Sequence, residues 1–378
     1  MTQYASMIRK LKTAPVMESL IHLYGNRDGM LVAQTARYIN LLKRHEEQFN
    51  SIEQPVLLVS APGRTEIGGN HTDHNRGKVL AAAVNLDTVA AVSARDDMLV
   101  HLHSEGYPAL ELDLSDLTPH ENEKGTTASL IRGVAARMSQ LGYKIGGFDA
   151  VATSNVASGS GLSSSAAFEV LTCAILDKLY NNWCIDFKLR AQIAQYAENE
   201  FFGKPSGLMD QMASSAGGLV HIDFKNDDPM VRPLTYDFAK KGYALVVDNT
   251  GGSHADLTAD YAAMPIEMKQ VAAFFGEDCL RRVRPEQIIQ ELPRLREKVS
   301  DRAIMRAIHF FNENKRVVKQ VEALEKMILT HSLLRLSPAA APASCICKMC
   351  TPVRMISRCR LHYVLRKTSS ITRARGVS

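Results

Sequence analysis

One segment of the chain restricts the possible folds more than any other, because a strand, a glycine- and serine-rich turn and an apolar helix follow one another directly. The pattern predicts a strand over residues 148–153, a turn over 154–161 and a helix over 162–180. Gly159 and Gly161 permit backbone conformations that let amide groups converge on an anion. The helix N-terminus adds free N–H groups and a positive dipole end. The segment therefore predicts a phosphate-binding loop.

Three consecutive serines strengthen this interpretation, because Ser163, Ser164 and Ser165 add hydroxyl donors and a possible Mg²⁺ ligand. Two common phosphate motifs do not match. A dinucleotide fingerprint requires glycine where Ser164 stands, and a Walker A loop is excluded because Gly203-Lys204 is followed by Pro205. A serine-capped helix without a ligand remains the alternative.

A second segment, residues 63–77, is expected to be a polar loop. It precedes residues 79–92, whose almost entirely apolar sequence is typical of buried strands. A loop dense in hydrogen-bonding groups on a rigid sheet predicts ligand recognition. A metal cluster of His71, Asp73 and His74 is one alternative, and a solvated loop with Asx-type turns is another. The polar side chains of this segment are Arg64, Glu66, Asn70, His71, Asp73, His74, Asn75 and Arg76.

Carboxylates downstream could complete a phosphoryl-transfer site. Glu198 lies on a predicted helix over 188–202, and Asp210 follows a Pro205–Gly207 break. A kinase needs one carboxylate to hold Mg²⁺ and another near the acceptor hydroxyl. Because carboxylates on helices are usually solvated, this pair gains weight only from the two segments above.

The order of elements indicates the fold class. Strands concentrate in the first half of the chain and helices in the second, which favours a two-layer α+β fold over a doubly wound sheet. Further helices are expected over 15–47, 126–141, 206–215, 256–275 and 298–326. Further strands are expected over 55–59, 97–103, 109–113, 219–224 and 243–248.

The composition changes after residue 326. The chain of 378 residues has a formal charge of +5, yet residues 327–378 contain nine Lys and Arg and no Asp or Glu. The positive charge therefore comes from the tail and does not predict a nucleic-acid partner. The chain lacks an apolar run that could span a membrane and an N-terminal secretion signal, so we expect a cytoplasmic protein without a membrane partner.

Three motifs in order, GRTEIGGNHTDHNRGKVL, SGSGLSSSAA and AENEFFGKPSGLMDQ, resemble those of the GHMP small-molecule kinases, most closely the galactokinase family. The resemblance runs from about residue 55 to 326. It implies a two-domain α+β fold, with an N-terminal domain like the second domain of ribosomal protein S5, an incomplete ferredoxin-like C-terminal domain and the site between them. The expected boundaries are 1–50 for a helical extension, 51–225, 226–326, and 327–378 for an aberrant tail.

The resemblance also implies that the γ-phosphoryl group of ATP is transferred to the anomeric hydroxyl of a sugar, with ATP and Mg²⁺ as cofactors. Asp210 would be the catalytic carboxylate, and Arg64 would keep it ionised. Ser165 and Glu198 would bind Mg²⁺. The expected partners are a sugar and ATP, and the expected assembly is a monomer. The ATP phosphates would be held by Gly159, Ser160, Gly161, Leu162, Ser163, Ser164 and Ser165, and the sugar by Asn70, His71, Asp73 and Tyr261.

Some positions depart from the family signature. Asn70 stands where galactokinases have a glutamate that contacts the sugar, and Glu66, His74 and Arg76 also differ from the signature. Galactose is the expected substrate, with a related hexose or uronic acid as the alternative.

The tail lacks the third glycine-rich motif of the family. A shift of reading frame explains the acid-free sequence after Lys326, and we expect weak ordering after about residue 330, low solubility and little kinase activity. A basic nucleic-acid-binding tail is one alternative. A zinc site is another, with the tail cysteines Cys345, Cys347, Cys350 and Cys359 as ligands.

Two other functions stay open at this point. A non-catalytic relative could bind ATP and sugar as a sensor, although Arg64, Glu198 and Asp210 favour an enzyme. A metal-dependent hydrolase would instead use His71, Asp73 and His74.

Overall fold

The computed structural model describes residues 2–50, 54–157, 161–241, 243–244, 258–327 and 366–367. Contacts between residues divide the chain into two units. The first unit comprises Met1–Thr65 and Ala83–Gly217, and the second comprises Glu66–Ala82 and Gly218–Ser378. Strands β1 (Val56–Gly68) and β2 (Lys78–Ala94) contribute residues to both units. The domain boundaries expected from the motifs remain a prediction.

The first unit is built on a sheet in which β2, β5, β3 and β4 are neighbours in that order, and β1 pairs with β2. Strand β5 runs antiparallel to β2 and parallel to β3. This mixed pairing agrees with the α+β prediction, which is confirmed. The remaining elements of the unit are β3 (Leu99–Ser104), β4 (Leu110–Asp113), β5 (Phe148–Ser154), α1 (Gln3–Lys10), α2 (Ala14–Tyr24), α3 (Met30–Phe49), η2 (Glu121–Glu123), α4 (Thr127–Gln140), α5 (Ser164–Tyr180), α6 (Phe187–Tyr196), the π-helical turn η3 (Ala197–Phe202) and α7 (Met209–Ala216).

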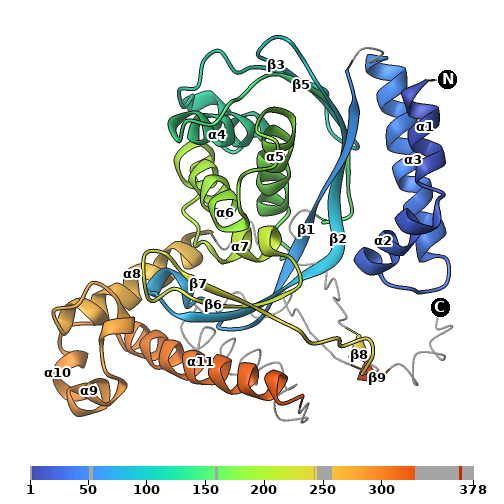
Figure 1. Cartoon of the computed structure of the whole chain (residues 1–378). Coiled ribbons are helices and arrows are strands. Elements are labelled where there is room, and N and C mark those ends of the chain that lie inside the picture. The colour runs from blue at the N-terminus through green and yellow to red at the C-terminus, as the bar shows by residue number, and fades with distance from the viewer. Residues whose placement is uncertain are drawn as a thin grey trace, which may run out of the picture. The chain divides into compact units, whose positions relative to one another are not determined.

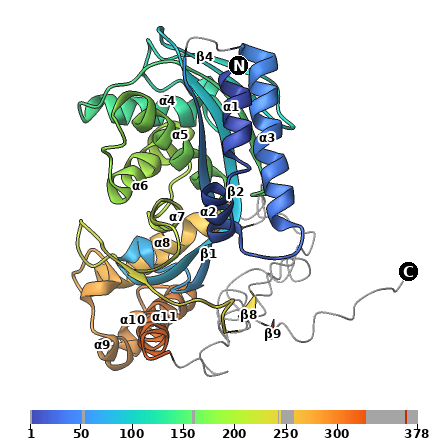
Figure 2. The same ribbon diagram turned by 45° about the vertical axis from the view of Figure 1, so that its right-hand side comes forward.

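Both faces of this sheet are covered, with α1–α3 on one face and α4–α6 on the other (Figures 1 and 2). Alternate residues of β2 explain why. Ala90 and Val92 belong to the cluster that includes α4 and α5, whereas Val89 and Ala91 belong to the cluster that includes α3. Successive side chains of a strand point to opposite faces, so an uninterrupted apolar run requires cover on both. The N-terminal helices therefore add a third layer to the two that the element order favours.

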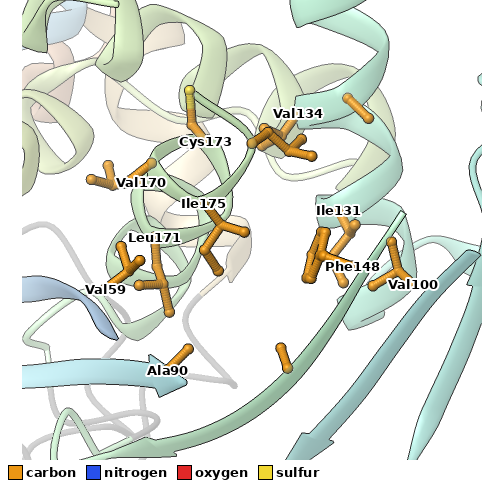
Figure 3. Packing of buried hydrophobic residues seen from close by; sticks show 14 of the residues in the cluster. Val59, Ala90, Val100, Ile131, Val134, Phe148, Val170, Leu171, Cys173 and Ile175 are labelled. Carbon is orange, nitrogen blue, oxygen red and sulfur yellow. The ribbon is translucent and has the colours of Figure 1, made fainter. Parts of the chain in front are cut away.

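The larger of these clusters forms the core between the sheet and α4–α6 (Figure 3). Phe148 on β5, Ile131 on α4 and Leu171 on α5 are each 2% exposed or less. This packing fixes β5 and α5, the two elements that flank the predicted phosphate loop.

In the second unit, the start of β2 pairs with β6 (Leu219–Asp223), and β6 pairs with β7 (Met230–Leu234). The longest helix, α11 (Asp301–Glu325), packs Val317, Val321 and Leu324 in one cluster with Leu80 and Leu219 of this sheet. The remaining elements are the 3₁₀ turns η1 (Asp73–Asn75) and η5 (Leu280–Arg282), the paired strands β8 (Tyr243–Ala244) and β9 (Arg366–Lys367), and helices α8 (Thr258–Phe274), α9 (Pro285–Gln290) and α10 (Leu292–Arg296).

Four expectations need correction. The helix expected over 15–47 is two helices, α2 and α3, because Gly25 and Gly29 interrupt it with φ angles of 85° and 76°. The polar loop is shorter than predicted, because β1 continues to Gly68 with alternating burial despite its polar side chains. The predicted helix over 188–202 changes to a π-helical turn at Ala197. Helices α1, α9 and α10 and strand β7 were not predicted. Strand β7 is mostly exposed and contains Pro233, as an edge strand can, so neither burial nor composition marked it.

The predicted tail lies almost wholly outside the described residues, which include only Arg366 and Lys367 beyond Met327. The four cysteines of the zinc alternative also lie outside them. In the part of the chain that is described, no helix has the length and apolar character needed to cross a membrane.

Candidate active site

The centre of the candidate site is an ion pair between Arg64, on β1, and Asp210, in the first turn of α7. Arg64 Nε donates to Asp210 Oδ1 at 2.7 Å, and Nη2 donates to Oδ2 at 2.6 Å. Such a two-bond arrangement fixes the plane of the carboxylate as well as its position. The Asp210 side chain remains 26% exposed, so a substrate hydroxyl can reach it.

The same arginine holds the phosphate loop. Its Nη1 donates to the carbonyl oxygen of Gly161 at 2.6 Å, and its backbone N–H donates to that of Leu162 at 3.1 Å. Gly63 allows this close approach, because a Cβ atom there would lie 3.0 Å from the Leu162 oxygen. Strand β1 therefore joins the predicted phosphate loop to the predicted catalytic carboxylate. Gly159 and Ser160 lie outside the described residues.

Ser163 caps the N-terminus of α5 in an unusual conformation. Its φ of 56° places a non-glycine residue in the left-handed region, which is uncommon and often marks a functional position. Its hydroxyl donates to Asp210 Oδ2, the oxygen that also accepts from Arg64. Ser163, predicted only as a phosphate donor, thus also orients the carboxylate. Ser164 and Ser165 follow it in the first turn of α5.

Glu198 occupies a buried polar centre in the π-helical turn and is 2% exposed. Ser165 Oγ and Lys204 Nζ each lie 2.9 Å from its Oε1, whereas Ser206 Oγ and Gln211 Nε2 each lie 2.7 Å from its Oε2. A serine hydroxyl beside a carboxylate is a pair of hard oxygen ligands of the kind Mg²⁺ prefers. Lys204 supplies the positive charge here, and its side chain is about half exposed. These residues therefore fit a magnesium ion.

Gln211 links Glu198 to a second buried carboxyl group. Its Nε2 also donates to Glu169 Oε2 at 3.0 Å, and Glu169 is fully buried on α5. Burial, aided by the nearby charge of Glu198, raises the pKa of Glu169 well above its ordinary value. Burial would lower the pKa of Lys204, but Glu198 outweighs it and the net shift is upward.

Sequence reasoning missed these supporting residues. Lys204, Ser206 and Gln211 all lie inside the AENEFFGKPSGLMDQ motif, and Glu169 is the one acidic residue in the apolar run SAAFEVLTCAIL. A lone charge within an apolar helix was the available signal, because a buried carboxyl group requires partners.

The predicted sugar-reading residues Asn70, His71 and Asp73 lie in the second unit, in the loop 69–77. His74 Nδ1 lies 3.0 Å from Asp73 Oδ1. Burial would raise the pKa of Asp73, but His74 and His71 outweigh it and lower it below the ordinary value. Asp73 is therefore an anionic acceptor suited to sugar hydroxyl groups.

Tyr261, the remaining predicted sugar contact, belongs to α8, but its side chain lies outside the described part of the structure. The structure thus brings together Arg64, Asp210 and Ser163, with Ser165 and Glu198 hydrogen-bonded to each other. Within the described residues, no three His, Cys, Asp or Glu side chains are grouped as a metal-binding cluster, so His71, Asp73 and His74 do not form one.

Two family models match the chain. A model described as the galactokinase galactose-binding signature matches residues 43–94, which include Asn70, His71 and Asp73. A model of the N-terminal domain of GHMP kinases matches residues 129–218, which include the serine loop, Glu198 and Asp210.

Curated relatives and solved structures agree with these matches. The chain is 35% identical over 277 residues to a galactokinase of Streptomyces coelicolor, covering 72% of this chain and 70% of that protein. It is 34% identical over 298 residues to human galactokinase, covering 74% and 70%. Its fold is similar to that of Lactococcus lactis galactokinase complexed with galactose, at a TM-score of 0.66 and 26% identity, covering 75% and 73%.

Proposed function

The chain belongs to the galactokinase family, and we propose that it transfers the γ-phosphoryl group of ATP to the anomeric hydroxyl of galactose. The observation that carries this proposal is that one arginine contacts both the proposed proton acceptor and the proposed phosphate loop. Arg64 holds the carboxylate of Asp210 and the backbone of the phosphate loop at Gly161.

In the proposed reaction, Asp210 accepts the proton of the anomeric hydroxyl while the oxygen of that hydroxyl bonds to the γ-phosphorus of ATP. The bond between that phosphorus and the β–γ bridging oxygen breaks, and ADP leaves. Phosphoryl transfer depends on alignment and charge stabilisation more than on covalent help from the protein. Arg64 and Ser163 meet this need by fixing the acceptor oxygens of Asp210.

We assign the phosphate contacts to the start of α5 and its preceding turn. Residues Gly161 to Ser165 present backbone and hydroxyl donors there, at the positive end of the helix dipole. Ser165 and Glu198 would hold Mg²⁺, which when bound neutralises charge on the phosphates of ATP. The cytoplasm is the compartment that we propose for this reaction.

We assign sugar recognition to Asn70, His71, Asp73 and Tyr261. The ionised Asp73 suits a hydroxyl donor, and a buried polar group rejects a sugar that leaves it unpaired. Asn70 carries an amide where the family signature has a carboxylate, so it can donate to as well as accept from a sugar hydroxyl.

A transfer assay on a sugar panel tests the proposal. The chain is incubated with γ-labelled ATP, Mg²⁺ and galactose, glucose, talose or galacturonate, and the products are identified by ³¹P NMR. We expect galactose 1-phosphate as the main product. Phosphorylation of another sugar in preference would overturn the substrate assignment. Binding of galactose and ATP with no transfer, even after the glycine-rich C-terminal motif is restored, would overturn the enzymatic one.

A further inference from the structure

Helix α11 holds the backbone of the loop that carries the proposed sugar contacts. The N–H of Gly69 donates to Glu313 Oε2 at 3.2 Å, and His309 Nε2 lies 2.9 Å from the carbonyl oxygen of Asn70. These two backbone groups immediately precede His71. Since His309 and Glu313 are four residues apart, they lie on the same face of the helix.

The loop conformation needs such support. Gly69 has a φ of 96°, and a Cβ atom there would lie 2.3 Å from the carbonyl oxygen of Lys78. His71 has a φ of 57°, a left-handed conformation that is unfavourable for a residue with a side chain. The chain therefore adopts this course only where surrounding contacts determine it.

The side chains of His309 and Glu313 are both buried, and each forms a hydrogen bond with its backbone partner. His309 is 4% exposed and Glu313 is 1% exposed, and Arg316 pairs with the Glu313 carboxylate. Burial lowers the pKa of His309 and outweighs the hydrogen bond to the Asn70 carbonyl, which acts in the opposite direction, so the neutral imidazole is favoured. A neutral imidazole has one N–H, and the carbonyl of Asn70 requires it on Nε2.

The same helix also holds the other end of the loop. Asn314 Oδ1 accepts from the N–H of Lys78 at 2.6 Å. Within the loop, the Thr72 hydroxyl donates to the carbonyl oxygens of Gly69 and Lys78 at 2.8 and 2.9 Å. The loop is thus closed at its base by Thr72, and its two ends are held by successive residues of α11.

We propose that His309 and Glu313 are positioning residues that fix the backbone before His71 and thereby set the affinity of the protein for its sugar. They touch neither reacting atoms nor substrate in this assignment, and act through Asn70 and His71. The inference rests on the proposed function, because it takes the loop 69–77 to be the sugar-reading element.

Two pairs of variants of the full-length chain test this inference. His309→Leu removes the donor and His309→Gln retains one, while Glu313→Leu removes the acceptor and Glu313→Gln retains one. Val321→Ala is the matched control, since Val321 is also buried on α11 but has no polar side-chain atom. Galactose and a non-hydrolysable ATP analogue are titrated by calorimetry, and hydrogen exchange is followed in the peptide covering residues 66–77.

We expect the leucine variants to bind galactose about tenfold more weakly or worse, because each leaves a backbone group without its partner. The glutamine variants should recover much of that loss, and exchange across residues 66–77 should rise only in the leucine variants. Affinity for the ATP analogue should stay within about threefold of the parent chain, because the proposed ATP contacts belong to the first unit whereas α11 belongs to the second. The Val321→Ala control should unfold at a lower temperature with unchanged galactose affinity.

The inference is overturned if the leucine variants bind galactose as the parent chain does, or if Val321→Ala weakens galactose binding equally. The first of these results would leave the kinase assignment intact. If instead the parent chain binds no galactose but exchange across 66–77 still rises only in the leucine variants, the sugar assignment fails and the positioning role stands.

Discussion

Arg64 and Asp210 are joined by two hydrogen bonds, from Nε to Oδ1 at 2.7 Å and from Nη2 to Oδ2 at 2.6 Å. The third nitrogen of the guanidinium, Nη1, donates to the Gly161 carbonyl at 2.6 Å. One side chain therefore holds both the Asp210 carboxylate and the backbone of the proposed phosphate loop. Changes on either side of this pair should affect the chemical step more than substrate binding.

Replacing Asp210 by asparagine should remove the proton acceptor while keeping the shape of the side chain. We expect kcat to fall by about 100- to 10,000-fold, the usual contribution of a general base, with galactose affinity retained. Transfer of labelled phosphoryl groups and calorimetry measure the two effects. Asp149→Asn is the control, because Asp149 forms an ion pair with Arg95 at 2.9 Å outside the site. Equal losses in both variants would contradict the assignment.

Replacing Arg64 by lysine tests the geometry of the pair separately from its charge. An ammonium group retains the positive charge but cannot make the planar two-bond contact and reach Gly161 as well. We expect kcat to fall by about tenfold or more in Arg64→Lys, and further in Arg64→Met, where the charge is lost too. A lysine variant with the parent kcat would show that charge alone is sufficient.

The apolar pattern predicted much of the first unit but not the arrangement around Glu198. Alternation and length are local properties of the sequence, so the strand around Ala90 and the helix after Ser163 could be predicted from them. The partners of Glu198 could not, because Lys204 and Gln211 reach it only through the π-helical turn and the packing of α7. Such side-chain networks depend on tertiary contacts that no local period encodes.

In the candidate site too, the sequence predicted which residues meet but not every role that they play. The motifs placed Arg64 and Asp210 in one site, and the structure brings them into contact. The second role of Ser163 was not foreseen, because its left-handed φ is a property of the folded turn and serine has no strong preference for it. Likewise, the extension of β1 to Gly68 depends on pairing with β2. The polar side chains at 64 and 66 gave no indication of a strand there.

Glu198→Gln should raise the magnesium concentration that transfer requires. The amide retains one oxygen ligand but loses the negative charge that binds a hard cation. We expect the magnesium dependence of both transfer and nucleotide binding to shift to about tenfold higher concentration or more. The exposed Glu121, which pairs with Lys124 at 2.7 Å, provides the control variant Glu121→Gln. An unchanged magnesium dependence would exclude Glu198 as a ligand.

The buried His221 should make the free energy of unfolding depend on pH. It is buried on β6, and neither of its ring nitrogens has a hydrogen-bond partner among the described residues. The pKa of His221 is lowered from 6.5 to about 4; burial is the largest cause, Arg232 and Lys78 add to it, and Asp223 and Glu325 act in the opposite direction. Between those values the unfolded chain binds a proton that the folded chain does not, so stability falls as the pH drops.

His221→Leu should therefore flatten the dependence of unfolding free energy on pH between about 6.5 and 4. The difference in slope can reach about 1.4 kcal/mol per pH unit for one proton. Urea unfolding at several pH values measures it, with the exposed His22→Gln as the control. Parallel curves for the parent chain and His221→Leu would refute this origin of the pH dependence.

The tail gives the last prediction. Residues 327–378 hold nine basic and no acidic residues, whereas residues 1–326 hold 36 basic and 40 acidic. We expect the gene to contain a second reading frame, one or two bases displaced near codon 326, that encodes a glycine-rich motif. Restoring it should raise kcat by about 100-fold or more, because that motif would add preorganised donors at the phosphates. A chain ending at Lys326 is the matched control and should turn over no faster and no slower than the printed chain. If the gene holds no such frame, the shift of reading frame is refuted. If the printed chain loses a high activity on removal of residues 327–378, the tail is a working part of the enzyme.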